Sequence, residues 1–346
     1  NVLSVNPGIT LLAGNSDSVQ VFYQGTPASS GFGSWFFGNH SGGPIISTLS
    51  EPYGAREWWP CKQSLNDKID SVDIFVRIPN GNLAASNGVL ESSQLIGNDR
   101  IMHWSHRYPI TCYLIAVSVT NYVEFSNYLP LGNGDSLEVL NYCYPQSLNN
   151  WQSLAGETVG LLQLYDSLFE PYPFITEKYG HAEWEWGGGM EHQTMSFMGT
   201  LNLSLVAHEL AHQWFGDKIT CGSWQDIWLN EGFATYLTGL AFENGYGVGN
   251  NLWYNWRTAV IGSATSQPDG SVYVDDTTSV GRIFSGRLSY NKAAYLLHML
   301  RWKMGDQDFF TSLQNYLQDS SLAFSYAKTD DLKYHLESTS GLDLTE

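Results

Sequence analysis

The fold and the chemistry of this chain are decided by residues 201–240, LNLSLVAHELAHQWFGDKITCGSWQDIWLNEGFATYLTGL. The first half of this stretch carries His208 and His212, four residues apart, on a segment whose apolar residues recur at helical spacing. Residues four apart lie one turn apart on one helix face, so both imidazoles can reach a single metal ion. Zinc is the natural metal for two imidazoles, and a third protein ligand would leave a fourth position for water.

Two glutamates accompany this histidine pair. Glu209 follows His208 directly, so it can contact a water at the ion without binding the ion itself. Glu231, in WLNEGFA, is separated from His212 by eighteen residues and begins a second expected helix. A glutamate in a first helical turn is also favourable through the helix dipole alone, and both interpretations can hold together. HExxH by itself arises by chance in on the order of one chain in a hundred of this length, so the second glutamate matters.

Composition limits the class of protein. The chain has 346 residues, enough for about two domains, and its 43% hydrophobic content excludes disorder as the default state. Acidic residues number 34 against 16 basic ones, and the net charge of -18 would repel a phosphate backbone, so we expect no nucleic-acid partner. No apolar run approaches the roughly 20 residues of a membrane span. A charged content of only 14% favours a secreted or periplasmic protein.

The hydrophobic period changes near residue 145. Residues 72–78 alternate as in a half-buried strand, and further strands are expected at 18–24, 102–106, 112–120 and 137–142. Beyond this point helical spacing predicts helices over 154–169, 203–215, 227–244, 290–304 and 306–318. We therefore expect an α+β fold. Its β-rich amino-terminal domain would cover 1–145, truncated at its start, and its mainly helical domain would cover 146–346.

Together the two motifs resemble the signature of the gluzincin aminopeptidases, the family of aminopeptidase N and leukotriene hydrolase. Other stretches match in order and spacing. GGMEH at 188–192 resembles the family's Gly-x-Met-Glu-Asn exopeptidase motif, Tyr290 in SYNK resembles its catalytic tyrosine, and REWWPC at 56–61 resembles a segment that precedes its cleft. The resemblance covers roughly residues 5–303. It implies an amino-terminal β-sheet domain followed by a thermolysin-like zinc-peptidase domain.

The resemblance also implies a role for each residue of the metal site. One zinc ion per chain would be held by His208, His212 and Glu231, with water at the fourth position. Glu209 would act as the general base that takes the proton of the zinc-activated water and passes it to the leaving amine. Tyr290 would share the charge of the oxyanion.

A second group of residues would bind the substrate. Glu191 is expected to read the free α-ammonium of a peptide by charge-assisted hydrogen bonding. Gly188, Gly189 and Met190 would form an edge strand along which the substrate backbone lies, where glycines permit a close approach. Glu51 matches a second acidic position that the family uses for the same ammonium. The expected substrates are therefore peptides with a free amino terminus.

Some features depart from the family pattern and leave alternatives open. His192 stands where the family has asparagine, and the family's longer amino-terminal domain and closing carboxy-terminal helical domain have no counterpart in this sequence, so we expect a fragment or a short relative. A zinc endopeptidase would need no ammonium reader. A non-catalytic peptide-binding relative would lack at least one residue of the metal site. An epoxide-hydrolysing relative would carry an acid where Arg282 stands.

Several details stay open at the level of sequence. Asp217 or Asp226 could orient the imidazoles, as acceptors behind zinc histidines usually do. Four cysteines are too few for a disulfide scaffold, and the pairs Cys112–Cys143 and Cys61–Cys221 are both conceivable. The side-chain preference and the oligomeric state are not indicated.

Overall fold

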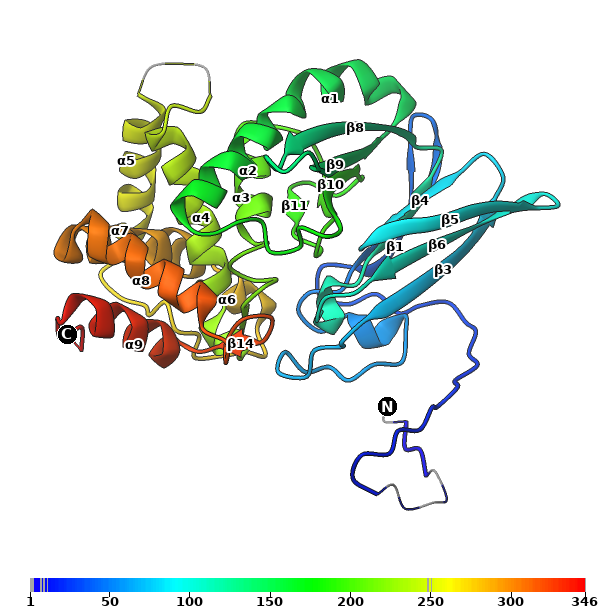
Figure 1. Cartoon of the computed structure of the whole chain (residues 1–346), viewed down its shortest axis with the longest axis horizontal. Coiled ribbons are helices and arrows are strands. Elements are labelled where there is room, and N and C mark those ends of the chain that lie inside the picture. Colours follow the sequence, from blue (N-terminus) through cyan, green and yellow to red (C-terminus); the bar gives the residue numbers. More distant parts are fainter. Residues whose placement is uncertain are drawn as a thin grey trace.

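The computed structural model describes residues 3–6, 8, 10, 12–247, 249 and 251–345. A β-rich region, on the right of Figure 1, is followed in the sequence by a helical region, on the left. The first region holds two antiparallel sheets, one of order β1-β2-β7-β4 and one of order β3-β6-β5. Their strands are β1 (Ser34–His40), β2 (Gly43–Leu49), β3 (Val72–Pro79), β4 (Leu83–Ser86), β5 (Val89–Ile96), β6 (Asp99–His106) and β7 (Val117–Thr120).

The two sheets are joined through the side chains that alternate inward from β4 and β6. Ala84, Met102 and Trp104 are fully buried between them. The indole Nε1 of Trp104 donates to the carbonyl of Ala84 at 3.0 Å, which satisfies its polar atom inside an apolar layer. The alternation predicted over 72–78 is confirmed in β3, which pairs along its whole length with β6.

A third sheet, of order β11-β12-β10-β9-β8, supports the helices. Its strands are β8 (Val123–Pro130), β9 (Ser136–Cys143), β10 (Lys178–Glu183), β11 (Gly189–Met190) and β12 (Ser196–Met198). β9 pairs in parallel with β10, and a Cβ at Gly180 would lie 2.2 Å from the carbonyl oxygen of Leu140, so only glycine fits this approach. The expected boundary between residues 145 and 146 passes through this single sheet, and the division into domains stays a prediction.

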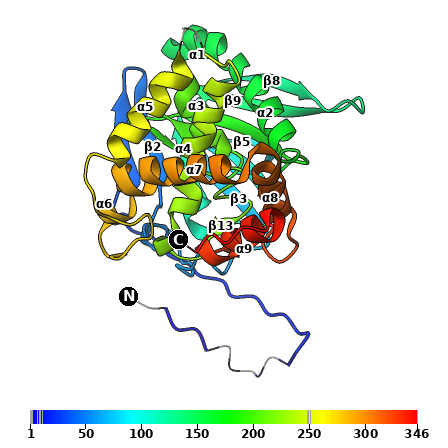
Figure 2. The same ribbon diagram turned by 90° about the vertical axis from the view of Figure 1, so that its left-hand side faces the viewer.

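The second region is mainly helical. Its helices are α1 (Leu148–Leu154), α2 (Gly156–Leu168), α3 (Leu203–Ala211), α4 (Trp228–Glu243), α5 (Leu252–Ala264), α6 (Val280–Ile283), α7 (Ala293–Met304), α8 (Asp306–Gln318) and α9 (Thr329–Ser340). α4 is buried on almost every face, with α3, α5 and α7 against it (Figure 2). A Cβ at Gly232 would lie 2.5 Å from the Cβ of Ala293, so this glycine permits the close contact of α4 with α7.

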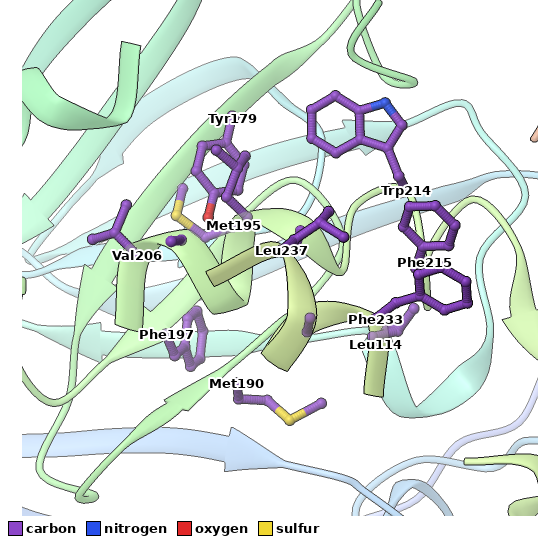
Figure 3. Packing of buried hydrophobic residues seen from close by; sticks show 14 of the residues in the cluster. Leu114, Tyr179, Met190, Met195, Phe197, Val206, Trp214, Phe215, Phe233 and Leu237 are labelled. Atoms are coloured by element: carbon purple, nitrogen blue, oxygen red, sulfur yellow. The ribbon is translucent and has the colours of Figure 1, made fainter. Parts of the chain in front are cut away.

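The core beneath the helices is aromatic. Trp214, Phe215 and Phe233 pack together, and Phe215 stacks on Phe233 with ring centroids 4.1 Å apart (Figure 3). On the other side, Val206 of α3 lies in the same buried cluster as Tyr179 of β10. This packing fixes α3 and α4 relative to the sheet, and those two helices carry the predicted metal ligands.

Several predicted elements differ from the observed ones. The strand expected at 18–24 is wrong: this segment is exposed and unpaired, because alternation alone supplies no neighbouring strand. The strand expected over 112–120 begins instead with the 3-10 turn Cys112–Leu114 and continues as β7. The helix expected over 203–215 ends at Ala211, because the chain then turns tightly, with the amide of Asp217 donating to the carbonyl of His212 at 2.9 Å.

The cysteines are free thiols, and neither pairing considered from the sequence is present. The neighbouring thiol of Cys112 lowers the pKa of Cys61. Within the described part of the chain, no helix is long and apolar enough to cross a membrane.

The β-rich region is attached to the second region through a buried asparagine. The side chain of Asn87 donates to the carbonyls of Leu114 and Gln193 at 2.9 and 2.7 Å, and it accepts from the amide of Ala116 at 2.8 Å. These bonds link three segments that lie far apart in the sequence.

We predict that Asn87→Ala destabilises the protein strongly. The change leaves three buried backbone groups without partners, each costing about 1–3 kcal/mol, so the free energy of unfolding should fall by roughly 3 kcal/mol or more. Urea unfolding followed by tryptophan fluorescence measures this, with Asn98→Ala, an exposed site, as the matched control. A loss below about 1 kcal/mol would show that the Asn87 contacts contribute little.

Candidate active site

The three predicted metal ligands converge at the contact of α3 with α4. Nε2 of His208 and Nε2 of His212 lie 3.2 and 3.4 Å from Oε2 of Glu231, and 3.2 Å from each other. A tetrahedral ion with bonds of about 2.0–2.1 Å needs donors roughly 1.6 times that distance apart, about 3.3 Å. These donor atoms therefore fit one face of a zinc coordination tetrahedron without further movement.

The hydrogen bonding of His212 prepares it for a metal. Its Nδ1 lies 3.2 Å from the carbonyl oxygen of Phe215. Because a carbonyl only accepts, Nδ1 carries the hydrogen and Nε2 is left to bind an ion. The acceptor is thus a backbone group, not the carboxylate of Asp217 or Asp226, which the sequence had suggested. Asp226 instead accepts from Ser223 and Thr329.

The electrostatics of the cluster favour a cation between these side chains. Burial alone would raise the pKa of Glu231, but the imidazoles of His212 and His208 hold it well below its usual range. Burial alone would lower the pKa of His212, yet the carboxylates of Glu191 and Glu231 raise it to about 10. The surroundings of His212 are therefore negative enough to retain a proton, and a divalent ion supplies the same positive charge more effectively.

Glu209, which follows the first histidine on α3, is buried next to a glycine of the edge strand. Its Oε2 has no hydrogen-bond partner among the described residues, and burial raises its pKa well above 4.5. A Cβ at Gly189 would lie 2.3 Å from Oε1 of Glu209, so the glycine leaves the space that this carboxylate occupies. The arrangement keeps an unpaired carboxylate beside the three predicted metal ligands, although this carboxylate is not itself one of those ligands.

Tyr290 reaches the site from the π-helical turn Gly286–Lys292 that precedes α7. Its hydroxyl donates to Oε1 of Glu231 at 2.8 Å, and its ring stacks on His208 with centroids 6.0 Å apart. Burial and the surrounding carboxylates raise the pKa of Tyr290, so its hydroxyl stays protonated and can donate. The sequence had predicted a helix beginning at Tyr290; the wider turn instead places the residue within the helical run.

Two further carboxylates face the same cavity, which has a volume of about 560 Å³. Glu191 is 3% exposed and Glu51, two residues after the end of β2, is 5% exposed. Each has an Oε1 without a hydrogen-bond partner among the described residues. Burial raises the pKa of both, and in Glu51 the neighbouring carboxylate of Glu191 raises it further. An unpaired buried carboxylate is costly, and a cationic group of a ligand would relieve that cost.

The remaining residues of the predicted substrate strand have distinct positions. Gly188 has φ +93°, a conformation that favours glycine, and its carbonyl accepts from the amide of Gly199. Met190 is buried and lines the cavity. Among the strands that the structure describes, β11 pairs with β12 alone and lies at the edge of its sheet, so its other side can pair with a peptide backbone.

His192, the departure from the family motif, is fully buried and packs against Phe197 with ring centroids 4.4 Å apart. Both of its ring nitrogens lack hydrogen-bond partners among the described residues, and burial lowers its pKa to about 3. The imidazole is therefore neutral. It does not belong to either group of potential metal donors among the described residues.

Sequence reasoning missed an aromatic wall of the cavity. Phe32, Trp186 and Phe284 line it from three distant segments. The ring of Phe32 lies 5.4 Å from that of Trp186 and 5.0 Å from that of Phe284, centroid to centroid. No local pattern singles these residues out from the chain's other aromatics, because their convergence arises only in the folded chain.

A second group of side chains could also be considered as metal donors. Glu191, Glu209 and His212 also bring one donor atom each within 4.8 Å of one another. This set shares His212 with the first one, whose donors already have tetrahedral spacing. The carboxylates of Glu191 and Glu209 therefore lie outside the set of donors with tetrahedral spacing.

Two histidines and a glutamate at tetrahedral spacing, next to an unpaired carboxylate, form the kind of donor set found in zinc metallopeptidases. The Peptidase family M1 domain matches residues 191–346. The chain is 28% identical over 322 residues to Aminopeptidase M1 of Arabidopsis thaliana, covering 85% of this chain and 35% of that protein. It is 28% identical over 310 residues to human Endoplasmic reticulum aminopeptidase 1, covering 83% of this chain and 32% of that protein.

Solved structures agree with the fold. An M1 zinc metallopeptidase from Deinococcus radiodurans superposes with a TM-score of 0.79 at 25% identity, over 92% of this chain and 71% of that one. A two-domain M1 zinc metallopeptidase bound to L-tryptophan gives a TM-score of 0.79 at 25% identity, over 91% and 71% of the two chains. The chain is thus similar to M1 aminopeptidases over most of its length, and zinc is the metal named for the solved structures that it resembles. It spans about a third of the length of the curated relatives it matches.

We predict one zinc ion per chain after chelation and repletion, with a rise in melting temperature because the ion binds the native state. His212→Ala and Glu231→Ala should each reduce the bound zinc to well below one per chain, while His103→Ala, a histidine of the outer sheet, should not. Elemental analysis after gel filtration measures this. Full zinc occupancy in Glu231→Ala would move the third ligand to another residue.

Proposed function

We propose that this chain is a zinc-dependent aminopeptidase, which removes the amino-terminal residue of peptides. The observation that carries the proposal is the pair of buried carboxylates, Glu51 and Glu191. They face the same cavity as the metal donors, and each leaves an oxygen unpaired. Every peptide with a free amino terminus supplies a cationic α-ammonium group. The two carboxylates bind this group by charge-assisted hydrogen bonds.

The residues around the metal donors perform the proton transfers. Bound zinc supplies Lewis acidity and lowers the pKa of water to roughly 7. Glu209 accepts the proton of the attacking water and returns it to the leaving amine. Its raised pKa supports this role, because a buried carboxylate holds a proton more readily than an exposed one.

Tyr290 assists the same step as a hydrogen-bond donor. Its hydroxyl is held beside the metal donors by Oε1 of Glu231. As negative charge develops on the substrate carbonyl oxygen, the hydroxyl donates to that oxygen, a contribution typically worth about 3 kcal/mol. Because the interaction strengthens in the transition state, it acts on kcat more than on KM.

The proposal extends to the architecture and the location. It includes a thermolysin-like catalytic domain over 146–346 behind an amino-terminal β-domain over 1–145, supported by the packing of α3 against α4 at the metal donors. It also includes a secreted or periplasmic location, supported by the charged content of 14%. Cell fractionation with an antibody against the protein tests the location.

A zinc endopeptidase is the competing function. It would use the same metal donors and Glu209 but would have no requirement for a free amino end. Two buried carboxylates with unpaired oxygens favour the aminopeptidase, since an endopeptidase would leave that cost without compensation.

We predict that Glu209→Gln keeps zinc but lowers kcat by roughly 10²–10⁴-fold, because the amide retains the shape and cannot accept a proton. Turnover of an aminoacyl-naphthylamide and zinc content are measured on the same preparation. Glu157→Gln, an exposed glutamate of α2, is the control and should retain its rate. Loss of zinc from Glu209→Gln would instead make Glu209 a ligand.

We also predict that Glu191→Ala lowers kcat/KM for free peptides by roughly a hundredfold or more, because an ammonium loses its partner in a desolvated site. Acetylating the substrate should cost the wild type a similar factor and should cost the variant little more. Glu185→Ala, at an exposed glutamate between β10 and β11, is the matched control. Equal cleavage of free and acetylated substrates by the wild type would favour the endopeptidase.

A further inference from the structure

We propose that the cavity selects peptides whose amino-terminal region carries a bulky uncharged side chain, and that Phe32 is the residue that sets this selectivity. The inference rests on the proposed aminopeptidase function and names its substrate class. It follows from the charge of the cavity wall, from the aromatic cluster at Phe32, and from the way the Phe32 loop is held.

The cavity is divided by charge. Its carboxylates belong to Glu51, Glu191, Glu209 and Glu231, the residues assigned above to the ammonium, the proton and the metal. Apart from the metal-donor histidines His208 and His212, every other described residue that lines the cavity is uncharged, among them Leu49 and Trp256. A lysine or arginine side chain of a substrate would therefore find no carboxylate of its own. An acidic one would meet only groups of like charge.

The apolar part of the wall is built for contact with a large side chain. Phe32, Trp186 and Phe284 meet edge to face, at interplanar angles of 72° and 60° about Phe32. Phe32 is only half-buried although it packs against two rings, so part of its ring is open to the cavity that it lines. Aromatic walls of this kind bind aromatic and long aliphatic groups through burial and ring contacts.

Phe32 is held in place by a hydrogen-bonded loop of the β-rich region. The carboxylate of Glu57 accepts from the amide of Ser30 at 3.0 Å and from the hydroxyls of Ser30 and Ser34. Gly33 donates back to the carbonyl of Ser30 at 2.8 Å, which closes the turn around Phe32. Glu57 is therefore a positioning residue, and Phe32 presents a preorganised surface that loses little entropy on binding.

The test compares kcat/KM for phenylalanyl, leucyl, alanyl and arginyl naphthylamides. For the wild type we expect the phenylalanyl and leucyl substrates to exceed the arginyl one by roughly a hundredfold, since an unpaired charge is poorly accommodated. In Phe32→Ala the ratio of the phenylalanyl to the alanyl value should fall by about tenfold or more. Glu57→Ala should lower the same ratio, and Phe37→Ala, an exposed aromatic of β1, should leave it unchanged.

Direct binding separates this inference from the proposed function. Calorimetry with phenylalaninamide, alaninamide and argininamide measures binding selectivity without turnover. If Phe32→Ala fails to fold, Phe32→Leu replaces it in both assays. If no substrate is cleaved but phenylalaninamide binds tightest and loses that advantage in the Phe32 variant, the aminopeptidase proposal fails while the selectivity stands. A wild type that prefers arginyl substrates, or a Phe32 variant with unchanged ratios in both assays, would overturn the inference.

Discussion

The constraint on which the site depends is the crowding of buried carboxylates around two imidazoles. Glu51, Glu191, Glu209 and Glu231 are all nearly inaccessible to water, and they face one cavity. Carboxylates packed this closely repel one another, and each loses its hydration on burial. Such a cluster is tolerable in a folded protein only where positive charge is supplied. A metal ion between the histidines and an ammonium group at the unpaired carboxylate oxygens would supply this positive charge at two separate places. The charge balance is thus a physical reason for one cavity to bind both cations.

The helices and the edge strand make this crowding sterically feasible. Gly189 leaves the volume that the Glu209 carboxylate fills, and Gly232 lets α4 approach α7 closely enough for Glu231 and Tyr290 to bond. The long series of buried aromatic contacts around Phe215 and Phe233 then holds α3 and α4 at a fixed separation. Stability in this region therefore comes from apolar packing, and it offsets the electrostatic cost of the site.

The sequence predicted the metal donors because their geometry is local: the spacing of four within a helix carries the two histidines to one face. Helix α8 was predicted with its observed bounds, and the strand pattern over 72–78 was confirmed. Prediction from the sequence failed where tertiary contacts determine the secondary structure or the hydrogen-bond partner. The segment 18–24 has the alternation of a strand but no neighbouring strand. The two-residue strands β11, β13 (Thr220–Cys221) and β14 (Tyr326–Ala327) are too short to show any period. The acceptor behind His212 is a backbone carbonyl, which no residue pattern can reveal.

The shared cavity also has a consequence for how this protein can change over time. The groups that we propose to transfer protons and hold the ion lie on or directly after α3 and on α4, whereas Phe32 and Glu51 come from loops of the β-rich region. Substitutions or insertions near Ser30 and Ser34 alter the wall that meets the ligand and leave the reacting groups untouched. The residues that would set ligand selectivity are thereby separate from those that would carry out the reaction, whereas many enzymes use the same residues for both. Related proteins with this fold can therefore differ in the ligands that they accept while keeping the same residues around the metal donors.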